Sequence, residues 1–273
     1  MARTWWPLQL FTLHVRISMR ENWVRQKLNR GEPTIGCFIG LGSPHVAELL
    51  AHAGYDWLVL ETEHSAVDIA QVEHMMMAIS GADTIPIVRV MNAEPIVIQR
   101  ALDAGAFGIL VPMVRTAADI EAIVKSTRYP PVGERGFGPL RASRYAKDYA
   151  EYARKANDNI IVSIIIETKE AIENIEEIAA VPGLDGMFLG LFDLSISYGL
   201  DPLELPHPEI DAAITRTLAA GNTSGVAVGM GSSTPEELLK LRKDGFTYLA
   251  YGSDYSLLTA GARGGLDAFD RGA

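Results

Sequence analysis

Cysteine, basic residues and long apolar runs are all scarce in this sequence of 273 residues. A single cysteine, Cys37, excludes a disulfide within the chain, suits a reducing cytoplasmic location and is expected to be a small buried residue of a strand. The 24 Lys and Arg stand against 34 Asp and Glu, and the net charge of −10 argues against nucleic acid as a partner because phosphates need a basic surface. No stretch is apolar over the ~20 residues that a membrane helix needs, so no membrane partner is expected.

The first 18 residues differ in character from the rest of the chain. They are rich in tryptophan and leucine, but polar residues and a proline interrupt them, so they lack the continuous apolar segment of a secretory signal. We expect residues 1–18 to be an extension upstream of a natural start at Met19. The alternative is an arm that packs on a neighbouring subunit. Residues 19–273 are expected to form one domain.

Eight short apolar runs alternate with helical patterns along the chain. The runs are continuously apolar rather than alternating, which is typical of strands buried on both faces of a parallel sheet. The predicted strands are Thr34–Leu41, Trp57–Glu63, Ile85–Val90, Gly108–Met113, Ile160–Glu167, Gly186–Gly190, Gly225–Met230 and Tyr248–Gly252. Eight such units in about 240 residues predict an α/β fold, a single-domain (β/α)8 TIM barrel. An open doubly wound sheet is the alternative, but the glycines at 40 and 42 do not complete a dinucleotide fingerprint.

Helical patterns follow most of the predicted strands, and one long irregular segment separates two of the units. The predicted helices are 43–53, 68–80, 94–104, 117–127, 147–156, 169–179, 208–220, 236–243 and 255–269. The irregular segment, residues 128–145, is rich in glycine and proline and carries Arg128, Arg135, Arg141 and Arg144. Loops of this length inside a compact domain are usually functional. We interpret the segment as one that folds over the barrel mouth to contact an anionic group, with a subunit contact as the alternative.

Two carboxylates close apolar strands that are neighbours in the predicted barrel. Glu167 follows a run in which only Ser163 is polar, and Asp193 follows the apolar run 186–192. The chemistry of a barrel lies at the carboxyl ends of its strands, and a carboxylate there is costly unless it is paired or bound to a metal. Two carboxylates from adjacent strands suit a hard divalent ion such as Mg²⁺ or Mn²⁺. The alternative is that each carboxylate caps the helix that follows.

Further polar residues end the second and third predicted strands. Glu61 lies near the end of one strand and His64 just after it, while Arg89 ends an otherwise apolar strand. An imidazole beside a carboxylate can exchange protons near neutral pH, and an arginine can bind a carboxylate through two parallel hydrogen bonds. A structural rim histidine and an ion pair of Arg89 with Glu61 or Glu63 are the alternatives.

Four motifs in the chain resemble those of the HpcH/HpaI family of class II pyruvate aldolases, such as 4-hydroxy-2-oxoheptanedioate aldolase and the 2-keto-3-deoxy sugar-acid aldolases. They are the runs Gly54–His64 and Arg128–Gly136, the pair Ile166-Glu167 and the run Gly190-Leu-Phe-Asp-Leu-Ser195. The resemblance extends over about residues 36–258. It implies a barrel of the phosphoenolpyruvate/pyruvate type. The implied reaction is reversible aldol cleavage of 4-hydroxy-2-oxo acids to pyruvate and an aldehyde through a metal-stabilised enolate.

The resemblance also implies a role for individual residues. Glu167 and Asp193 match the metal ligands of the family. Arg89 matches the arginine that binds the pyruvate moiety. His64 matches the histidine of the acid/base machinery, and Glu61 stands where the family often has an aspartate paired with that histidine.

The turn Gly190–Asp193 matches a backbone segment that holds the pyruvate carboxylate, so Gly190, Leu191 and Phe192 are predicted substrate contacts. Two departures from the family lie close by. Leu191 and Phe192 replace a frequent Pro-Ala pair, and Ile165 replaces a common glutamine. These departures bear on which aldehyde the site accepts. The predicted metal ligands match the family pattern.

The implied cofactor is a divalent metal, Mg²⁺ or Mn²⁺, with Co²⁺ and Zn²⁺ as further candidates. The implied partners are pyruvate or another 2-oxo acid, an aldehyde, and other copies of the chain in a hexamer built as a trimer of dimers. Two alternatives stay open. An acyl-CoA lyase of the citramalyl-CoA/citrate lyase type on the same barrel would need a basic groove, which the arginines of segment 128–145 offer. The other alternative is a non-catalytic metal-binding barrel.

Overall fold

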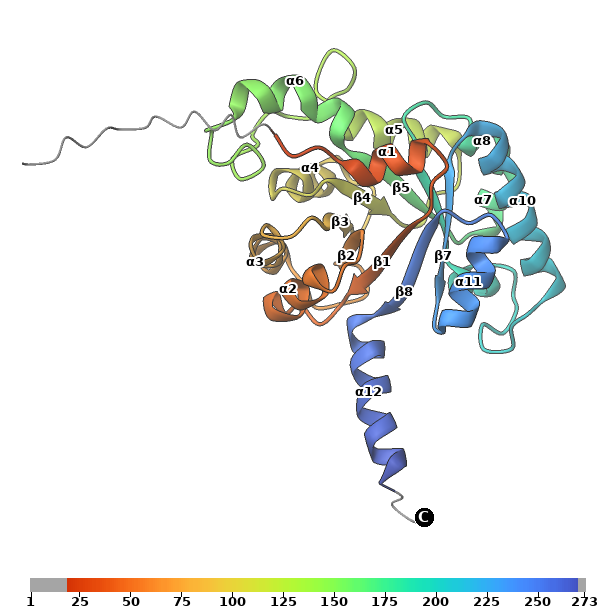
Figure 1. Ribbon diagram of the computed structural model, residues 1–273. Coiled ribbons are helices and arrows are strands. Elements are labelled where there is room, and N and C mark those ends of the chain that lie inside the picture. The colour runs from red at the N-terminus through yellow and green to blue at the C-terminus, as the bar shows by residue number, and fades with distance from the viewer. Residues whose placement is uncertain (1–18, 270–273) are drawn as a thin grey trace, which may run out of the picture.

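The computed structural model describes residues 19–269, and the expectation for residues 1–18 concerns a segment outside that range. Eight parallel strands close into a barrel in chain order, with β8 hydrogen-bonded to β1 (Figure 1). The strands are β1 Thr34–Ile39, β2 Trp57–Glu61, β3 Ile85–Arg89, β4 Gly108–Val111, β5 Ile161–Ile166, β6 Gly186–Leu189, β7 Ala227–Ser232 and β8 Tyr248–Ser253. The predicted (β/α)8 barrel and its eight strands are confirmed, and the β1–β8 pairing excludes the open sheet.

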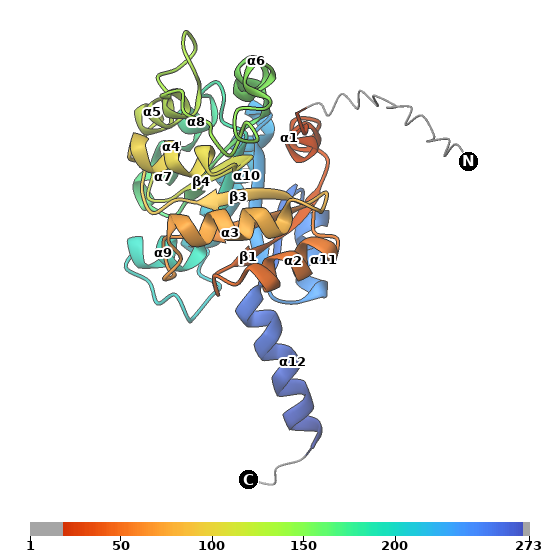
Figure 2. The same cartoon turned by 90° about the vertical axis from the view of Figure 1, so that its left-hand side faces the viewer.

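The helices surround the barrel, with one exception at the C-terminus. They are α1 Trp23–Asn29, α2 Pro44–His52, α3 Ile69–Ile79, α4 Pro95–Asp103, α5 Ala117–Thr127, α6 Tyr149–Asn159, α7 Lys169–Glu173, α8 Ile175–Ala179, α9 Leu191–Ser197, α10 Pro208–Ser224, α11 Pro235–Lys243 and α12 Asp254–Ala268. Helix α1 was not predicted, and α9 starts at Leu191 rather than after Asp193 as the capping alternative assumed. The predicted helix 169–179 is broken in two at Asn174. Helix α12 projects away from the barrel (Figures 1 and 2).

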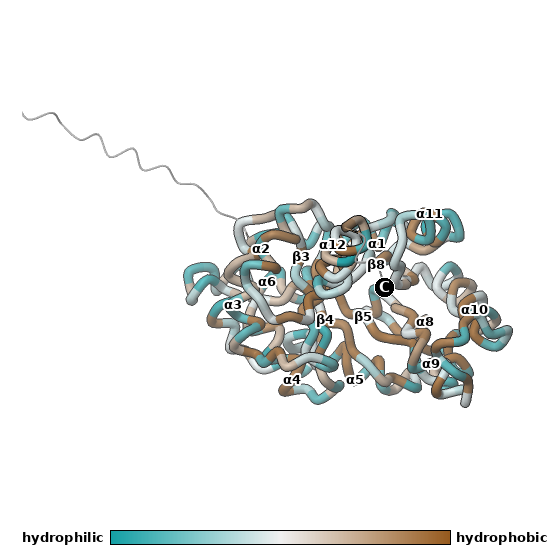
Figure 3. Tube along the Cα trace, turned by 90° about the horizontal axis from the view of Figure 1, so that it is seen from below, coloured by the Kyte–Doolittle hydropathy of each residue, from teal (hydrophilic) through white to brown (hydrophobic). Residues whose placement is uncertain are grey.

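Two apolar layers hold the barrel together. One fills its interior, and the other joins the outer faces of the strands to the helices. Successive side chains of a strand point to opposite faces, so the residues of each strand alternate between the two layers. Viewed from below, the apolar strands β4 and β5 lie inside a ring of more polar helices (Figure 3).

The N-terminal end of the barrel is closed by α1 and by aromatic packing. Val24 and Leu28 of α1 are buried in the interior layer. The ring of Trp57 lies 4.6 Å from that of Tyr248 and packs over Gly36, where an added Cβ would overlap the indole. The interior of the barrel is therefore filled at this end, and the polar side chains that end the strands lie at the opposite end.

The long segment after α5 lies at the N-terminal end, not over the mouth. Arg141 Nη1 donates to the carbonyl of Ala104 before β4, and Arg128 Nη2 donates to that of Ile160 before β5. The expectation that this segment covers the mouth is wrong. A segment that follows a helix and precedes a strand starts at the end of the barrel opposite the catalytic loops. Within residues 19–269, no helix combines the length and apolar character needed to cross a membrane.

Candidate active site

Every second residue of a strand points into the barrel interior, and the polar side chains at the mouth are the last of these inward-pointing residues. Glu61 and Arg89 are register partners on β2 and β3, and Glu167 directly follows β5. The interior series are Trp57, Val59 and Glu61 on β2, Ile85, Ile87 and Arg89 on β3, and Ile165 and Glu167 on β5. The two-residue period thus directs all three polar side chains into the mouth of the barrel.

Arg89 lies at the centre of this group. Its Nη1 is 3.2 Å from Glu61 Oε2, and its Nη2 is 2.5 Å from Glu63 Oε2 and 3.8 Å from Glu167 Oε2. Its Nε is buried and has no hydrogen-bond partner among the residues that the structure describes. One cation therefore serves three carboxylates and keeps an N–H donor for a further oxygen. Sequence reasoning left the ion pair of Arg89 with Glu61 or Glu63 open, and both are present.

Glu61 organises the backbone after β2 rather than the imidazole. Its Oε1 accepts from the backbone N–H of Glu63 at 2.6 Å and of His64 at 3.0 Å. The imidazole Nε2 of His64 lies 3.6 Å from Glu63 Oε2, and the side chain is 60% exposed. The expected pairing of Glu61 with the histidine ring is replaced by a contact with Glu63. The side chain of glutamate is one methylene longer than that of aspartate, and Glu61 contacts the backbone of the turn. The imidazole ring of His64 contacts Glu63 instead.

Glu63 is the site residue that sequence reasoning did not single out. It contacts both Arg89 and His64, and burial raises the pKa of its carboxyl, with the charges of Glu61 and Asp193 adding to the shift and those of Arg89 and His64 opposing it. The sequence did hold a sign of its role, because Glu63 stands two residues after Glu61. If the alternation of side chains in β2 continues beyond the strand, both carboxylates point in the same direction. The predicted strand did extend to Glu63.

Glu167 is buried, and burial raises the pKa of its carboxyl to about 6. The negative charges of Glu63 and Asp193 push in the same direction, while Arg89 and the backbone N–H of Met113 oppose the shift. That N–H donates to Glu167 Oε1 at 2.6 Å, and Met113 holds a left-handed φ of 57°. A left-handed conformation in a residue other than glycine is uncommon and is frequent at functional sites.

Asp193 lies in the first turn of α9, the helix that follows β6, and is exposed. Gly190 precedes this helix and packs against Glu167, since an added Cβ would lie 3.1 Å from Glu167 Oε2 and 2.9 Å from Ile165 Cγ2. The structure therefore brings β5 and β6 together as expected, with Glu167 facing the mouth and Asp193 at its edge. The capping alternative does not hold for Asp193, which lies inside the helix that Gly190 begins.

The chemistry of these carboxylates fits a hard divalent cation. Burial raises the pKa values of Glu63 and Glu167, and the negative charges of neighbouring carboxylates, Asp193 among them, add to the shift, so a bound cation would favour the charged forms. Within residues 19–269, no three His, Cys, Asp or Glu side chains are placed to hold an ion together. Mg²⁺ commonly takes only one or two carboxylates from protein and completes its octahedron with waters and substrate oxygens.

Besides Glu61, three residues depart from the family pattern, and they occupy different environments. Ile165 is buried in the barrel interior, and Leu191 packs partly on the outer apolar layer. Phe192 is 61% exposed at the edge of the mouth. Of these three residues, Phe192 is therefore the one exposed to a molecule that enters the mouth.

Asp254 and Cys37 take structural roles. Asp254, after β8, accepts hydrogen bonds from the backbone N–H groups of Gly40 and Leu41 at 3.0 and 2.9 Å and so joins β8 to the loop after β1. Cys37 is fully buried in the outer apolar layer, as expected. The arginines of segment 128–145 lie at the other end of the barrel, which removes the basic groove that the acyl-CoA alternative needed at the mouth.

Barrel and mouth together define a (β/α)8 protein that holds an arginine among carboxylates where its strands end. The sequence pattern of the HpcH/HpaI aldolase/citrate lyase family matches residues 34–260, and this chain belongs to that family. It is accordingly a carbon–carbon lyase of the class II pyruvate aldolase kind, and the predicted family and reaction class are confirmed. The family depends in general on a divalent metal.

Individual relatives agree with this assignment. The chain is 38% identical to a 4-hydroxy-2-oxo-heptane-1,7-dioate aldolase of Escherichia coli over 89% of this chain and 92% of the relative. It is 37% identical to a hydroxypyruvate/pyruvate aldolase of Pseudomonas aeruginosa over 92% and 94% of the two chains. A crystal structure of an HpcH/HpaI aldolase/citrate lyase family protein from Burkholderia cenocepacia matches with a TM-score of 0.87 and 35% identity, covering 91% of this chain and 99% of that one.

Proposed function

We propose that this chain catalyses the reversible aldol cleavage of 4-hydroxy-2-oxo acids to pyruvate and an aldehyde, with Arg89 as the anchor of the 2-oxo acid. The observation that supports the anchor is the position of Arg89 at the mouth, within 3.8 Å of the Glu167 carboxylate and with one N–H donor unused among the described residues. A guanidinium held in this way can donate to the oxygen on which charge develops.

Cleavage breaks the bond between C3 and C4 of the substrate. The C4 hydroxyl loses its proton to His64, directly or through a water, and becomes the aldehyde carbonyl. The electron pair of the broken bond moves to C3 and delocalises onto the C2 oxygen, where Arg89 donates a hydrogen bond to the enolate. Protonation of C3 then gives the methyl group of pyruvate. His64 is suited to both proton transfers because its imidazole is exposed at the mouth and rests against Glu63.

Glu167 and Asp193 are the residues that would hold the divalent metal, for which Mg²⁺ or Mn²⁺ is proposed ahead of Co²⁺ and Zn²⁺. When bound, such an ion supplies Lewis-acid polarisation of the 2-oxo acid. The backbone of the turn from Gly190 to Phe192 is proposed to receive the pyruvate carboxylate. Support comes from the start of α9 at Leu191, because the first N–H groups of a helix have no partner within it.

An assay of pyruvate release from 4-hydroxy-2-oxo acids, coupled to lactate dehydrogenase, tests the proposal. We expect release with Mg²⁺ or Mn²⁺, loss of release after EDTA treatment and recovery when the metal is restored. Activity that survives complete removal of metal would refute the class II mechanism. Cleavage of citramalyl-CoA in place of free 4-hydroxy-2-oxo acids would point to the acyl-CoA alternative.

We also propose that the chain assembles as a cytoplasmic homo-oligomer, a hexamer built as a trimer of dimers, through α12. From Leu258 to Phe269 every residue of this helix and its C-cap is exposed. The apolar residues follow helical spacing along one face, namely Tyr255, Leu258, Ala262, Leu266 and Phe269. An apolar stripe on an isolated helix calls for a partner surface, and a second copy of the barrel offers one.

Light scattering on the full chain and two variants tests this assembly. Leu258→Glu places a charge on the apolar stripe and is expected to reduce the oligomer to smaller species. Ala260→Glu places the same charge on the opposite face of α12 and is expected to leave the oligomer intact. A monomeric full chain, or equal masses for all three proteins, would overturn the assignment of α12 as the contact.

A further inference from the structure

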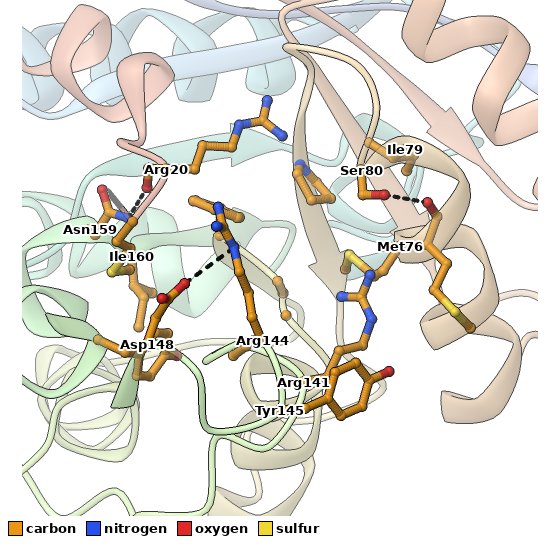
Figure 4. Close-up of a pocket in the computed structure, with 18 residues that line it drawn as sticks. Arg20, Met76, Ile79, Ser80, Arg141, Arg144, Tyr145, Asp148, Asn159 and Ile160 are labelled. Atoms are coloured by element: carbon orange, nitrogen blue, oxygen red, sulfur yellow. Dashed lines mark hydrogen bonds and ion pairs between the residues drawn. The ribbon is translucent and has the colours of Figure 1, made fainter. Parts of the chain in front are cut away.

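A cavity of about 400 Å³ lies at the N-terminal end of the barrel, at the far end from the candidate active site. Its floor is formed where the strands begin, by Pro86 at the start of β3, Phe107 before β4 and Ile160 before β5. Helix α3 supplies one wall, and the segment between α5 and α6 supplies another (Figure 4). A molecule in this cavity would contact neither Arg89 nor Glu167, which lie where their strands end.

Three arginines line the cavity, and Asp148 is the one carboxylate among its lining residues. Arg20 comes from the stretch before α1, and Arg141 and Arg144 come from the segment before α6 (Figure 4). Arg144 Nε lies 3.3 Å from Asp148 Oδ2, so that pair is partly neutralised. The cavity therefore carries excess positive charge in a protein whose net charge is −10.

Arg20 and Arg141 are held by carbonyl groups rather than by carboxylates. Arg20 Nη2 donates to the carbonyl of Thr84 at 2.8 Å, and its guanidinium lies 5.5 Å from the ring of Phe107. Arg141 Nη1 donates to the carbonyl of Ala104 at 2.7 Å. Each of these bonds uses one of the five N–H donors of a guanidinium and fixes its direction without neutralising it.

The pKa values of both guanidinium groups are shifted. Burial lowers the pKa of Arg20 and of Arg141, with more distant acidic and tyrosine groups opposing the effect only in part. Within residues 19–269, neither side chain forms an ion pair. A half-buried cation without a counter-charge is disfavoured, and an anion in the cavity would offset that cost.

The remaining surface of the cavity indicates what the anion carries. Met76 and Ile79 of α3 line the cavity together with Pro86, Ala106 and Phe107. Apolar walls with a few convergent charged groups are the usual composition of a small-molecule site. Inorganic ions alone would leave this apolar surface exposed to water.

The backbone beside the cavity is strained. Arg144, Tyr145 and Ala146 have φ values of 54°, 56° and 68°, so three consecutive residues other than glycine are left-handed. A left-handed residue other than glycine persists only where its surroundings enforce it, and such residues cluster at ligand sites. The strain turns the chain so that Arg144 and Tyr145 line the cavity.

We propose that this cavity binds a small organic anion, a carboxylate or a phosphate ester with an apolar body, at a site separate from the catalytic mouth. Arg20 and Arg141 hold the anionic group, Arg144 contributes a third donor, and the apolar floor receives the body. The site does not depend on the proposed aldolase reaction and takes a ligand other than its substrates.

The fluorescent anion 8-anilinonaphthalene-1-sulfonate is a suitable probe, titrated into the full chain at saturating pyruvate and Mg²⁺ so that the mouth is occupied. The test variant is Arg141→Gln/Arg144→Gln, and the matched control is Arg154→Gln, which removes an exposed arginine of neighbouring α6. We expect saturable binding in the wild type and the control. The double variant is expected to lose affinity by about tenfold or more, the usual loss when a charge-assisted hydrogen bond is removed.

A second variant guards against misfolding of the first. Ser80→Trp fills the cavity from its exposed edge without removing an arginine and is expected to block the probe while aldol cleavage stays near wild type. Displacement of the probe by phenylacetate or by phenyl phosphate then identifies which anionic group is preferred. Equal probe binding by the wild type, the double variant and Ser80→Trp would overturn the proposal, as would the absence of saturable binding in the wild type at saturating pyruvate.

Discussion

The guanidinium of Arg89 joins Glu61 and Glu63, two carboxylates of the same β2 turn, with Nη1 3.2 Å from Glu61 Oε2 and Nη2 2.5 Å from Glu63 Oε2. The β2–β3 register makes Glu61 and Arg89 direct partners, so the first contact follows from strand pairing. The second requires the turn, which Glu61 itself holds through two backbone N–H groups. Arg89, the proposed anchor of the 2-oxo acid, is thus held from two sides.

Replacing Arg89 by alanine is expected to lower kcat/KM for pyruvate release by about 100-fold or more, because the enolate oxygen loses a charged donor. The change also leaves Glu61 and Glu63 without their shared cation. Steady-state kinetics measures the loss, and circular dichroism checks that the barrel persists. Arg115→Ala, at a half-exposed arginine paired loosely with Glu170, is the control and should retain activity. Near-normal turnover of Arg89→Ala would show that Arg89 is not the anchor.

Glu63→Gln tests the residue that contacts both Arg89 and His64. Losing this charge should lower kcat by on the order of tenfold, with a smaller effect on KM, because the ion pair that positions the guanidinium is weakened. Glu61→Gln keeps an oxygen for the two backbone N–H groups and is the matched comparison. If only Glu61→Gln impairs kcat, then Glu61 and not Glu63 is the positioning carboxylate.

Asp193→Ala is expected to weaken the binding of Mn²⁺ by about tenfold or more, since one of two proposed carboxylate ligands is removed. Calorimetric titration of the full chain measures the affinity directly. Asp211→Ala removes an exposed carboxylate from the first turn of α10 and should leave the affinity unchanged. Unchanged affinity in Asp193→Ala would remove this residue from the ligand set.

Gly190→Ala tests whether the position of the Glu167 carboxylate matters, because it displaces the carboxylate without removing its charge. An added Cβ would lie 3.1 Å from Glu167 Oε2 and 2.9 Å from Ile165 Cγ2, so the carboxylate must move by a few tenths of an ångström. Metal affinity and kcat are expected to fall together, by on the order of tenfold, while the melting temperature changes little. Gly81→Ala, where an added Cβ meets nothing within 4 Å, is the control. Wild-type metal affinity in Gly190→Ala would contradict the packing argument.

Cys37 is expected to resist thiol reagents in the native protein. Burial raises the pKa of its thiol to about 12, and the charge of Asp254 acts in the same direction, so the reactive thiolate is suppressed below that pH. Labelling with Ellman's reagent at about pH 8 should be negligible in buffer and complete in denaturant. Reactivity should rise with pH only as the thiol approaches its raised pKa or as the protein unfolds. Rapid stoichiometric labelling of the folded protein would show that the strand is not buried as described.

Much of the catalytic end could be predicted because its determinants are local. Apolar runs of four to eight residues predicted the strands, and polar residues at the ends of some of these runs predicted which side chains would meet at the mouth. Glu61, Arg89 and Glu167 meet there because the two-residue alternation of a strand is set by backbone geometry alone. Helix α1 escaped prediction because it is short and its two buried residues, Val24 and Leu28, make sense only beneath a closed barrel.

The sequence by itself determined the barrel, the family and the residues at the strand ends. Tertiary structure decided that Glu63 rather than Glu61 faces the His64 ring, that residues 128–145 lie at the N-terminal end, and that α12 leaves the barrel. The physical reason is the distance along the chain over which each feature is determined. Periodicity and strand ends depend on neighbours along the chain, whereas the partner of a side chain depends on how the closed sheet and its turns bring distant segments together.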